Sequence, residues 1–301
     1  MTRSPQSPAP SRDALSGARD GAPIYLFDAG EEERRLIAQA RLFDPLTERL
    51  FRTAGLASGM RVLDLGSGVG DTAMLAARIV GPSGSVLGVD ISAERLGVAR
   101  SRATAAGLRQ LRFVAADVVE GLPDDEPEFD AVIGRLVLMY LRDPVRALRA
   151  AAARLRPGGL VCFQEVDATF DPCHPPSPVW GQAQEWFLET AARAGVELRM
   201  GVRLHPTFLA AGLPAPELRL EAAIGGGERA PAFAWADVFC SMAPLMERLG
   251  VATAAEVEPG TLGERLQDEV TARDGVVIAP LLIGAWARAH DRASAGRSAD
   301  S

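Results

Sequence analysis

The sequence predicts an α/β protein in which a parallel sheet is covered by helices on both faces. Short apolar stretches typical of buried strands alternate with helical stretches from residue 57 to residue 168. The connections between them are short, as in repeated βαβ units. With 301 residues, 48% of them hydrophobic, the chain is long enough to bury a substantial core.

The N-terminal part divides into a tail and a helical cover. Residues 1–23 are rich in Pro, Ser and Ala without an apolar segment, so we expect a disordered tail rather than a signal peptide. Residues 24–56 are predicted to be a helical cover, with apolar residues at helical spacing. Asp44 and Pro45 are expected to divide this cover into two helices, as N-cap and first helical residue.

The central part, residues 57–168, contains the clearest alternation. We expect strands at 61–66, 85–90, 111–117, 129–134 and 160–166. Helices are predicted at 71–80 and 92–106, and from Asp143–Pro144 to the turn at 156–159. The sequence therefore predicts five parallel strands with helical crossovers.

The last part, residues 169–290, changes pattern after a proline-rich loop. Helical stretches at 179–194, 233–250 and 260–272 mix with strand-like stretches at 215–224 and 275–286. We expect this part to complete the sheet and to insert helices over one edge, so that residues 24–290 form one domain. Residues 291–301 read as a second disordered tail.

The stretch LDLGSGVGD, Leu63 to Asp71, joins the first strand to the first helix of the alternation. Gly66, Gly68 and Gly70 leave backbone N–H groups at a helix N-terminus open to a ligand, because no side chain blocks the approach. Such a turn is typical of nucleotide binding, but by itself it does not say which nucleotide is bound.

Three acidic residues at the ends of successive strands indicate the nucleotide. Asp90 is placed to accept hydrogen bonds from ribose hydroxyls, which both NAD and S-adenosylmethionine (SAM) carry. Asp64 would repel a pyrophosphate but attract the ammonium of a methionyl group. Asp117 is placed to accept from an adenine amino group. The sixth position of a dinucleotide fingerprint is Asp71 rather than Gly, and together these features favour SAM.

In these motifs the chain resembles the class I SAM-dependent methyltransferases. The matching stretches are VLDLGSGVGD (62–71), VLGVDIS (86–92), VAADVVEGLP (114–123) and the segment 129–165. The resemblance covers residues 31–166 strongly and the remainder loosely. It implies the seven-stranded, doubly wound, Rossmann-like sheet of that family, with N-terminal and inserted helices over the active site.

The resemblance also implies positions for the parts of SAM. Gly66, Ser67 and Gly68 would lie against the methionyl part, and the backbone of Arg135 would approach the same end. Asp90 would hold the ribose. The adenine base of SAM would contact Ile91, Asp117 and Val118. In related chains an N-terminal segment often closes this site, which makes Tyr25 and Gln39 weaker candidates for cofactor contact.

Few residues are candidates for acting on the molecule that accepts the methyl group. Glu165, at the end of the fifth strand, is the first candidate for a general base. Tyr140 is a weaker candidate that would line the acceptor site, and His205 is another weak candidate base. Many members of the family that this chain resembles carry His at the position of Met139 or Tyr140, and this chain does not.

The acceptor is expected to be a small molecule, with methyl transfer to an oxygen or nitrogen of a specialised metabolite. Aromatic residues of the inserted helices would form an apolar lid if they face the cofactor; they are Trp180, Trp186, Phe187, Trp235 and Phe239. Transfer to an activated carbon, with Glu165 as base, is an alternative. An NAD-binding oxidoreductase and a non-catalytic methyltransferase-like binding module are alternatives of other classes.

The composition of the chain limits the kinds of binding partner to expect. A net charge of −7 and the lack of a long Lys/Arg run disfavour nucleic acid. No apolar run is long enough to span a membrane, and no targeting segment is evident, so we expect a cytoplasmic protein. Cys162, Cys173 and Cys240 are too widely spaced for a disulfide framework or a zinc site, and no metal is expected. The apolar last strand and the inserted helices leave a homodimer open.

Overall fold

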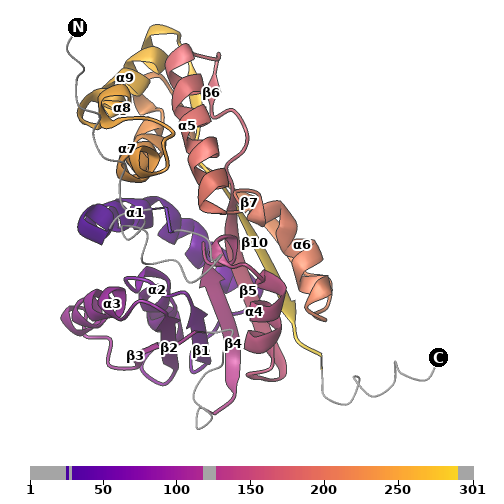
Figure 1. Ribbon diagram of the computed structural model, residues 1–301. Coiled ribbons are helices and arrows are strands. Elements are labelled where there is room, and N and C mark those ends of the chain that lie inside the picture. The colour runs from indigo at the N-terminus through magenta and orange to yellow at the C-terminus, as the bar shows by residue number, and fades with distance from the viewer. Residues whose placement is uncertain (1–24, 27–28, 118–126, 291–301) are drawn as a thin grey trace, which may run out of the picture.

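The computed structural model describes residues 25–26, 29–117 and 127–290, and within the first helix the side chains of residues 29–41 are not described. The tails expected at 1–23 and 291–301 therefore lie outside the described residues. Figure 1 shows a sheet with helices on both faces and a group of helices beyond one end of it.

The sheet has seven strands in the order β3-β2-β1-β4-β5-β10-β7. Its strands are β1 (Arg61–Leu65), β2 (Ser85–Asp90), β3 (Leu111–Ala115), β4 (Phe129–Arg135), β5 (Leu155–Asp167), β7 (Glu217–Glu221) and β10 (Leu281–Arg288). The first five pair in parallel, whereas β10 is antiparallel to both β5 and β7. The predicted α/β fold with a seven-stranded sheet is confirmed. Because β1 lies between β2 and β4, the direction of winding reverses at β1, where ligands of such sheets bind.

Helices cover both faces of this sheet. Helices α1 (Ala29–Ala54), α2 (Asp71–Val80) and α3 (Ala93–Ala105) share one buried cluster with Val62 of β1. Leu63, the next residue of β1, belongs to a second cluster with residues of α4 (Pro144–Ala152) and α6 (Met200–Ala210). This alternation follows from the two-residue period of a strand. The sequence pattern did not predict α6.

The N-terminal cover is one helix rather than two. Pro45 lies inside α1, where it removes one backbone hydrogen bond. The helix continues because Phe43, Leu50 and Phe51 bury their side chains against the sheet side of the molecule. Asp44 does not cap a helix, since its carboxylate is bonded to Arg135 of β4 instead. The expected division at Asp44–Pro45 is therefore wrong.

A cap extends beyond the carboxyl ends of β4 and β5. It contains α5 (Pro178–Ala194), α7 (Ala232–Arg248), α8 (Ala254–Val257) and α9 (Pro259–Ala272), which gather at one end of Figure 1. The cap also holds a small sheet in the order β6-β9-β8, formed by Cys173–His174, Val276–Ile278 and Ile224–Gly226. These three strands follow or precede β5, β10 and β7 along the chain, in the same spatial order. The small sheet was not predicted.

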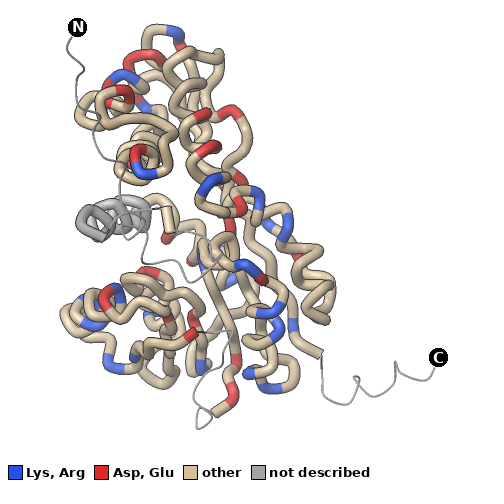
Figure 2. The backbone as a smooth tube through the Cα atoms, viewed as in Figure 1, with Lys and Arg blue, Asp and Glu red and all other residues tan. Residues whose placement is uncertain are grey.

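Charges of both signs are interspersed along the described backbone, as Figure 2 shows. Among the described residues, no helix has the length and apolar character needed to cross a bilayer.

Candidate active site

The turn between β1 and α2 has the shape of a ligand cradle. Gly66, Gly68 and Gly70 all have positive φ values, of 62°, 52° and 92°. A Cβ atom on Gly66 would collide with the side chain of Val137, so only glycine allows this close approach. A Cβ on Gly68 would meet no atom within 4 Å. The backbone at Gly68 therefore faces open space at the N-terminus of α2.

Asp90, at the end of β2, fixes the shape of this turn. Its Oδ2 accepts from the N–H of Gly68 at 2.9 Å, and its Oδ1 accepts from the N–H of Ser92 at 2.8 Å. The guanidinium of Arg95 lies 3.8 Å from Oδ1. The next residue, Ile91, is 62% exposed, an unusual position for a large apolar side chain beside a polar site. Asp90 and Ile91 thus present a carboxylate and an apolar surface side by side.

Asp64 is a buried carboxylate that lacks a well-formed hydrogen bond in the described part of the chain. Its side chain is fully buried in β1, and neither carboxylate oxygen has a hydrogen-bond partner of normal geometry among the described residues. Burial raises its pKa well above the usual range, and the positive charge of Arg135 offsets part of this effect. The buried Oγ of Ser67 likewise has no partner in the described part of the chain. Unsatisfied buried groups are rare, and here they suit a ligand with a cationic, hydrogen-bonding end.

Arg135, at the end of β4, joins this site to α1. Its Nη1 lies 2.9 Å from Oδ1 of Asp44 and 2.9 Å from Oγ1 of Thr47. The Thr47 hydroxyl also lies 2.6 Å from Oε1 of Gln164, which is buried in β5. This polar cluster ties α1 to the carboxyl ends of two strands.

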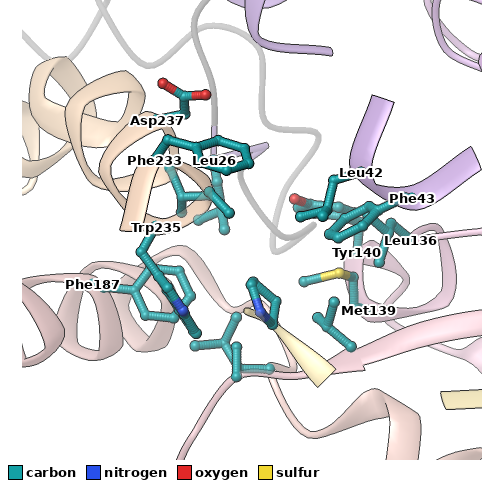
Figure 3. A pocket seen from close by; sticks show the side chains of 16 residues that line it. Leu26, Leu42, Phe43, Leu136, Met139, Tyr140, Phe187, Phe233, Trp235 and Asp237 are labelled. Carbon is teal, nitrogen blue, oxygen red and sulfur yellow. The ribbon is translucent and has the colours of Figure 1, made fainter. Parts of the chain in front are cut away.

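A largely apolar cavity lies between the sheet and the cap, and Figure 3 shows its walls. It contains about 710 Å³ of empty space, part of it open to solvent. The lining residues come from α1, the β4–α4 connection, β5, α5, α7 and the N-terminal segment; they include Leu26, Leu42, Phe43, Leu136, Met139, Tyr140, Phe187, Phe233, Trp235, Asp237 and Pro280. Asp237 is the only carboxylate among the described lining residues, and it points away from the aromatic rings in Figure 3.

The aromatic lid predicted for the inserted helices is present in part. Phe187 and Trp235 line the cavity and pack edge to face, with ring centroids 5.9 Å apart. The indole N–H of Trp235 donates to the carbonyl of Ile278, so the ring offers only its apolar surface to the cavity. Trp180 and Phe239 are buried elsewhere in the cap, and Trp186 is also outside the lining.

Glu165 is fully buried and does not line the cavity. Its Oε1 accepts from the N–H groups of Val137 at 2.9 Å and Leu138 at 2.8 Å, while Oε2 has no partner among the described residues. Burial raises its pKa to about 7, and hydrogen bonds from backbone N–H groups, that of Leu138 foremost, offset part of the shift. One oxygen of the carboxylate is thus engaged by the backbone of the β4–α4 connection.

The remaining predicted site residues lie in different parts of the structure. Tyr140 lines the cavity, and its ring lies 5.0 Å from that of Tyr25, which in turn lies under the guanidinium of Arg95 at 4.0 Å. Asp117 follows β3 and is half-buried. His205 lies on α6, which packs on β5 and β10 away from the cavity. Val118 and the side chain of Gln39 lie outside the described residues.

Several residues of the site were not indicated by the sequence. Leu26, Phe43 and Phe233 line the cavity, and Arg95 links Asp90 to Tyr25. These residues come from segments far apart in the chain, so no local spacing could have indicated them. Across the described residues, no cluster of His, Cys, Asp or Glu has the arrangement of a metal site.

The chain is similar to known methyltransferases. The family described as "Methyltransferase domain" matches residues 56–197. Aklanonic acid methyltransferase DauC of Streptomyces sp. (strain C5) is 37% identical over 122 residues, which are 40% of this chain and 54% of that protein. The ubiquinone/menaquinone biosynthesis C-methyltransferase UbiE of Pseudomonas putida (strain GB-1) is 37% identical over 113 residues, 37% of this chain and 44% of that protein.

The chain spans about half the length of these two curated relatives. Among solved structures, YcgJ of Bacillus subtilis has a TM-score of 0.51 at 20% identity, covering 81% of this chain and 98% of that one. At this level of identity the structural likeness concerns the fold alone. The range matched by the family, residues 56–197, contains the glycine turn and the three strand-end acids.

Proposed function

Because the chain belongs to the class I SAM-dependent methyltransferases through residues 56–197, we propose that it transfers a methyl group to an apolar small molecule, at an oxygen or nitrogen atom. SAM, the cofactor of this family, supplies an activated methyl group on a sulfonium when bound. The protein then has to bind the cofactor and the acceptor, to orient them relative to each other, and to exclude water. The observation that carries the proposal is an apolar cavity directly beside a cradle that contains an unpaired, buried Asp64.

The residues present fit the cofactor. Asp64 and the Oγ of Ser67 supply acceptors for a cationic amino-acid end, and the open backbone at Gly68 leaves room for it. Asp90 supplies a carboxylate for ribose hydroxyls, and the exposed side chain of Ile91 supplies an apolar surface for a base. Because Asp64 is costly to bury unpaired, its retention in the core is easiest to explain by a ligand that neutralises it.

The walls of the cavity support an apolar acceptor. Five aromatic rings among the described residues line it, those of Phe43, Tyr140, Phe187, Phe233 and Trp235. A ligand of matching character gains free energy by leaving water, whereas a highly charged one would lose its hydration. We therefore propose an acceptor with an extended apolar or aromatic framework.

Transfer to oxygen or nitrogen is favoured by the chemistry of the lining. No histidine or lysine lies among the described lining residues, and the carboxylate of Glu165 is bonded to backbone N–H groups. An amine lone pair, or an acidic hydroxyl that ionises near neutral pH, needs no strong base from the protein. Transfer to carbon needs a base to remove a proton after methyl addition, and for that role Glu165 is poorly placed.

The test is a thermal-shift titration of the full chain with SAM, with S-adenosylhomocysteine and with NAD. A ligand that binds the native state raises the melting temperature with concentration. We expect shifts with SAM and S-adenosylhomocysteine and none with NAD. Asp64→Asn should lose these shifts, because it removes the charge that faces the ammonium, while the exposed Glu185→Gln should keep them.

Methyl transfer is then measured as formation of S-adenosylhomocysteine with panels of apolar phenols, enols and amines. Turnover with a panel member supports the proposal. Shifts without turnover on any panel would instead favour the non-catalytic binding module. Shifts with NAD alone would overturn the cofactor assignment.

A further inference from the structure

Glu165 holds a turn that both parts of the site share. Leu136 has a φ of 54°, in the left-handed region that is unfavourable for a branched side chain. The short 3-10 helix Leu138–Tyr140 follows directly, and Val137, its N-cap residue, makes no side-chain cap hydrogen bond. The Oε1 of Glu165 supplies the missing acceptor, at 2.9 Å from Val137 N and 2.8 Å from Leu138 N. A residue 27 positions away thus caps this helix.

The same turn contacts the cofactor cradle on one side. The Val137 side chain fills the space that a Cβ on Gly66 would need, and its Cγ1 lies 3.0 Å from where a Cβ on Gly134 would be. The glycine turn and the β4–α4 turn therefore pack directly on each other. A displacement of Val137 would change the support of the backbone at Gly66.

On its other side the turn forms a wall of the acceptor cavity. Leu136, Met139 and Tyr140 all line the cavity. The side chains of residues 136–140 thus support the cofactor cradle on one side and form part of the wall of the acceptor cavity on the other. Reaction rates depend steeply on such alignment, since a misplacement of about 1 Å can cost about 100-fold.

We propose that Glu165 is a positioning residue that aligns acceptor cavity with cofactor cradle by holding the turn 136–140 through its backbone N–H groups. This inference rests on the proposed function, in which the glycine turn holds SAM and the cavity holds the acceptor. It replaces the role of general base that the sequence suggested for Glu165. The side chain acts through the turn and does not touch the reacting atoms.

Three variants test the inference. Glu165→Gln keeps an oxygen that can accept from both N–H groups, whereas Glu165→Ala removes the acceptor. Asp167→Asn is the matched control, because Asp167 ends the same strand but its carboxylate bonds to Thr169. If Glu165→Ala does not fold, Glu165→Asp replaces it, since its side chain is one methylene too short to span the same distance.

Three measurements apply to each variant. Hydrogen–deuterium exchange reports protection of the peptide containing residues 136–140. Calorimetry gives the affinity for S-adenosylhomocysteine, and fluorescence gives the affinity for N-phenylnaphthylamine, an uncharged aromatic probe of the cavity. We expect Glu165→Gln and Asp167→Asn to retain protection and both affinities. Glu165→Ala should lose protection and weaken both affinities by about tenfold or more, the loss typical of a hydrogen bond to a charged group.

Two results would overturn the inference. One is unchanged protection and affinity in Glu165→Ala. The other is a Glu165→Gln variant with normal protection and binding but a methyl-transfer rate reduced about 100- to 10,000-fold, which is the loss expected for a general base. If the wild-type protein binds no S-adenosylhomocysteine, the proposed function fails, while exchange and probe affinity still decide whether Glu165 holds the turn.

Discussion

Arg135 and Asp44 form an ion pair of 2.9 Å between Nη1 and Oδ1, which joins the end of β4 to the middle of α1. The Arg135 side chain is only 7% exposed, so its charge is poorly solvated without the carboxylate. Burial raises the pKa of Asp44, and Arg135 offsets part of that rise. The pair therefore fixes α1 at the place where the cavity and the cofactor cradle meet.

Removing this carboxylate should destabilise the fold measurably. We expect Asp44→Ala to lower the free energy of unfolding by about 1.5–3 kcal/mol, because Arg135 loses a charged hydrogen-bond partner. Urea unfolding measures this change. Glu48→Ala on the same helix is the control, since the exposed Glu48–Arg52 pair should contribute about 0.5 kcal/mol or less. Equal losses in the two variants would contradict the role assigned to Asp44.

A second prediction separates backbone strain from ligand contact at Gly68. Gly68 and Gly107 have φ values of 52° and 67°, and a Cβ on either would meet no atom within 4 Å. Alanine at each position should therefore cost a similar amount, about 1–2 kcal/mol, measured by urea unfolding. Only Gly68→Ala should also lose affinity for S-adenosylhomocysteine in calorimetry, because its methyl group enters the cradle. Normal affinity in Gly68→Ala would mean that the ligand does not approach this backbone.

The raised pKa of Glu165 predicts how stability depends on pH. In the folded protein this pKa is about 7, against an ordinary value of 4.5, so the folded state binds the proton more tightly than the unfolded chain does. The contribution of Glu165 to stability must then fall as pH rises from about 4.5 to about 7, and stay low above that. Glu165→Gln has no proton to lose at this position.

The measurement is the difference in unfolding free energy between wild type and Glu165→Gln at several pH values. Wild type should lose about 2–3 kcal/mol relative to the variant between pH ~5 and pH ~8, because most of the shift from 4.5 to about 7 falls in this range. A difference that does not vary with pH would show that Glu165 titrates normally.

The cavity mouth gives a fourth prediction. Phe233 is 54% exposed and lines the cavity, and Leu209 on α6 is 48% exposed and does not. Because neither side chain is buried, alanine at either position should change stability by only about 0.5 kcal/mol. Phe233→Ala should weaken N-phenylnaphthylamine binding by about three- to tenfold, while Leu209→Ala should leave it unchanged. Equal affinities in the two variants would place the probe outside this cavity.

The sheet and the cofactor cradle could be predicted from sequence because their signals are local. Apolar strands, the glycine turn and the acids that follow each strand lie within short segments, and topology brings their ends together. Asp64 and Asp90 thus lie where expected, although only the structure shows that the Asp64 carboxylate has no hydrogen bond of normal geometry among the described residues.

Where local rules failed, tertiary contacts outweighed them. Asp44–Pro45 has the composition of a helix start, yet the ion pair with Arg135 and the burial of neighbouring apolar residues keep α1 continuous. The role of Glu165 depends on the backbone conformation at Leu136, a residue 29 positions earlier. The cavity is lined by residues from Leu26 to Pro280, and no spacing in the chain reveals such distant neighbours.

The small sheet of the cap has a consequence for how the protein unfolds. Two residues, Ala222 and Ala223, separate β7 from β8, and two others, Ala279 and Pro280, separate β9 from β10. Because each link has only two residues, β8 follows almost directly on β7, and β10 almost directly on β9. We expect the cap and the sheet to melt together in one cooperative transition, with equal calorimetric and van't Hoff enthalpies. Loss of the acceptor cavity on heating would then coincide with loss of the whole fold.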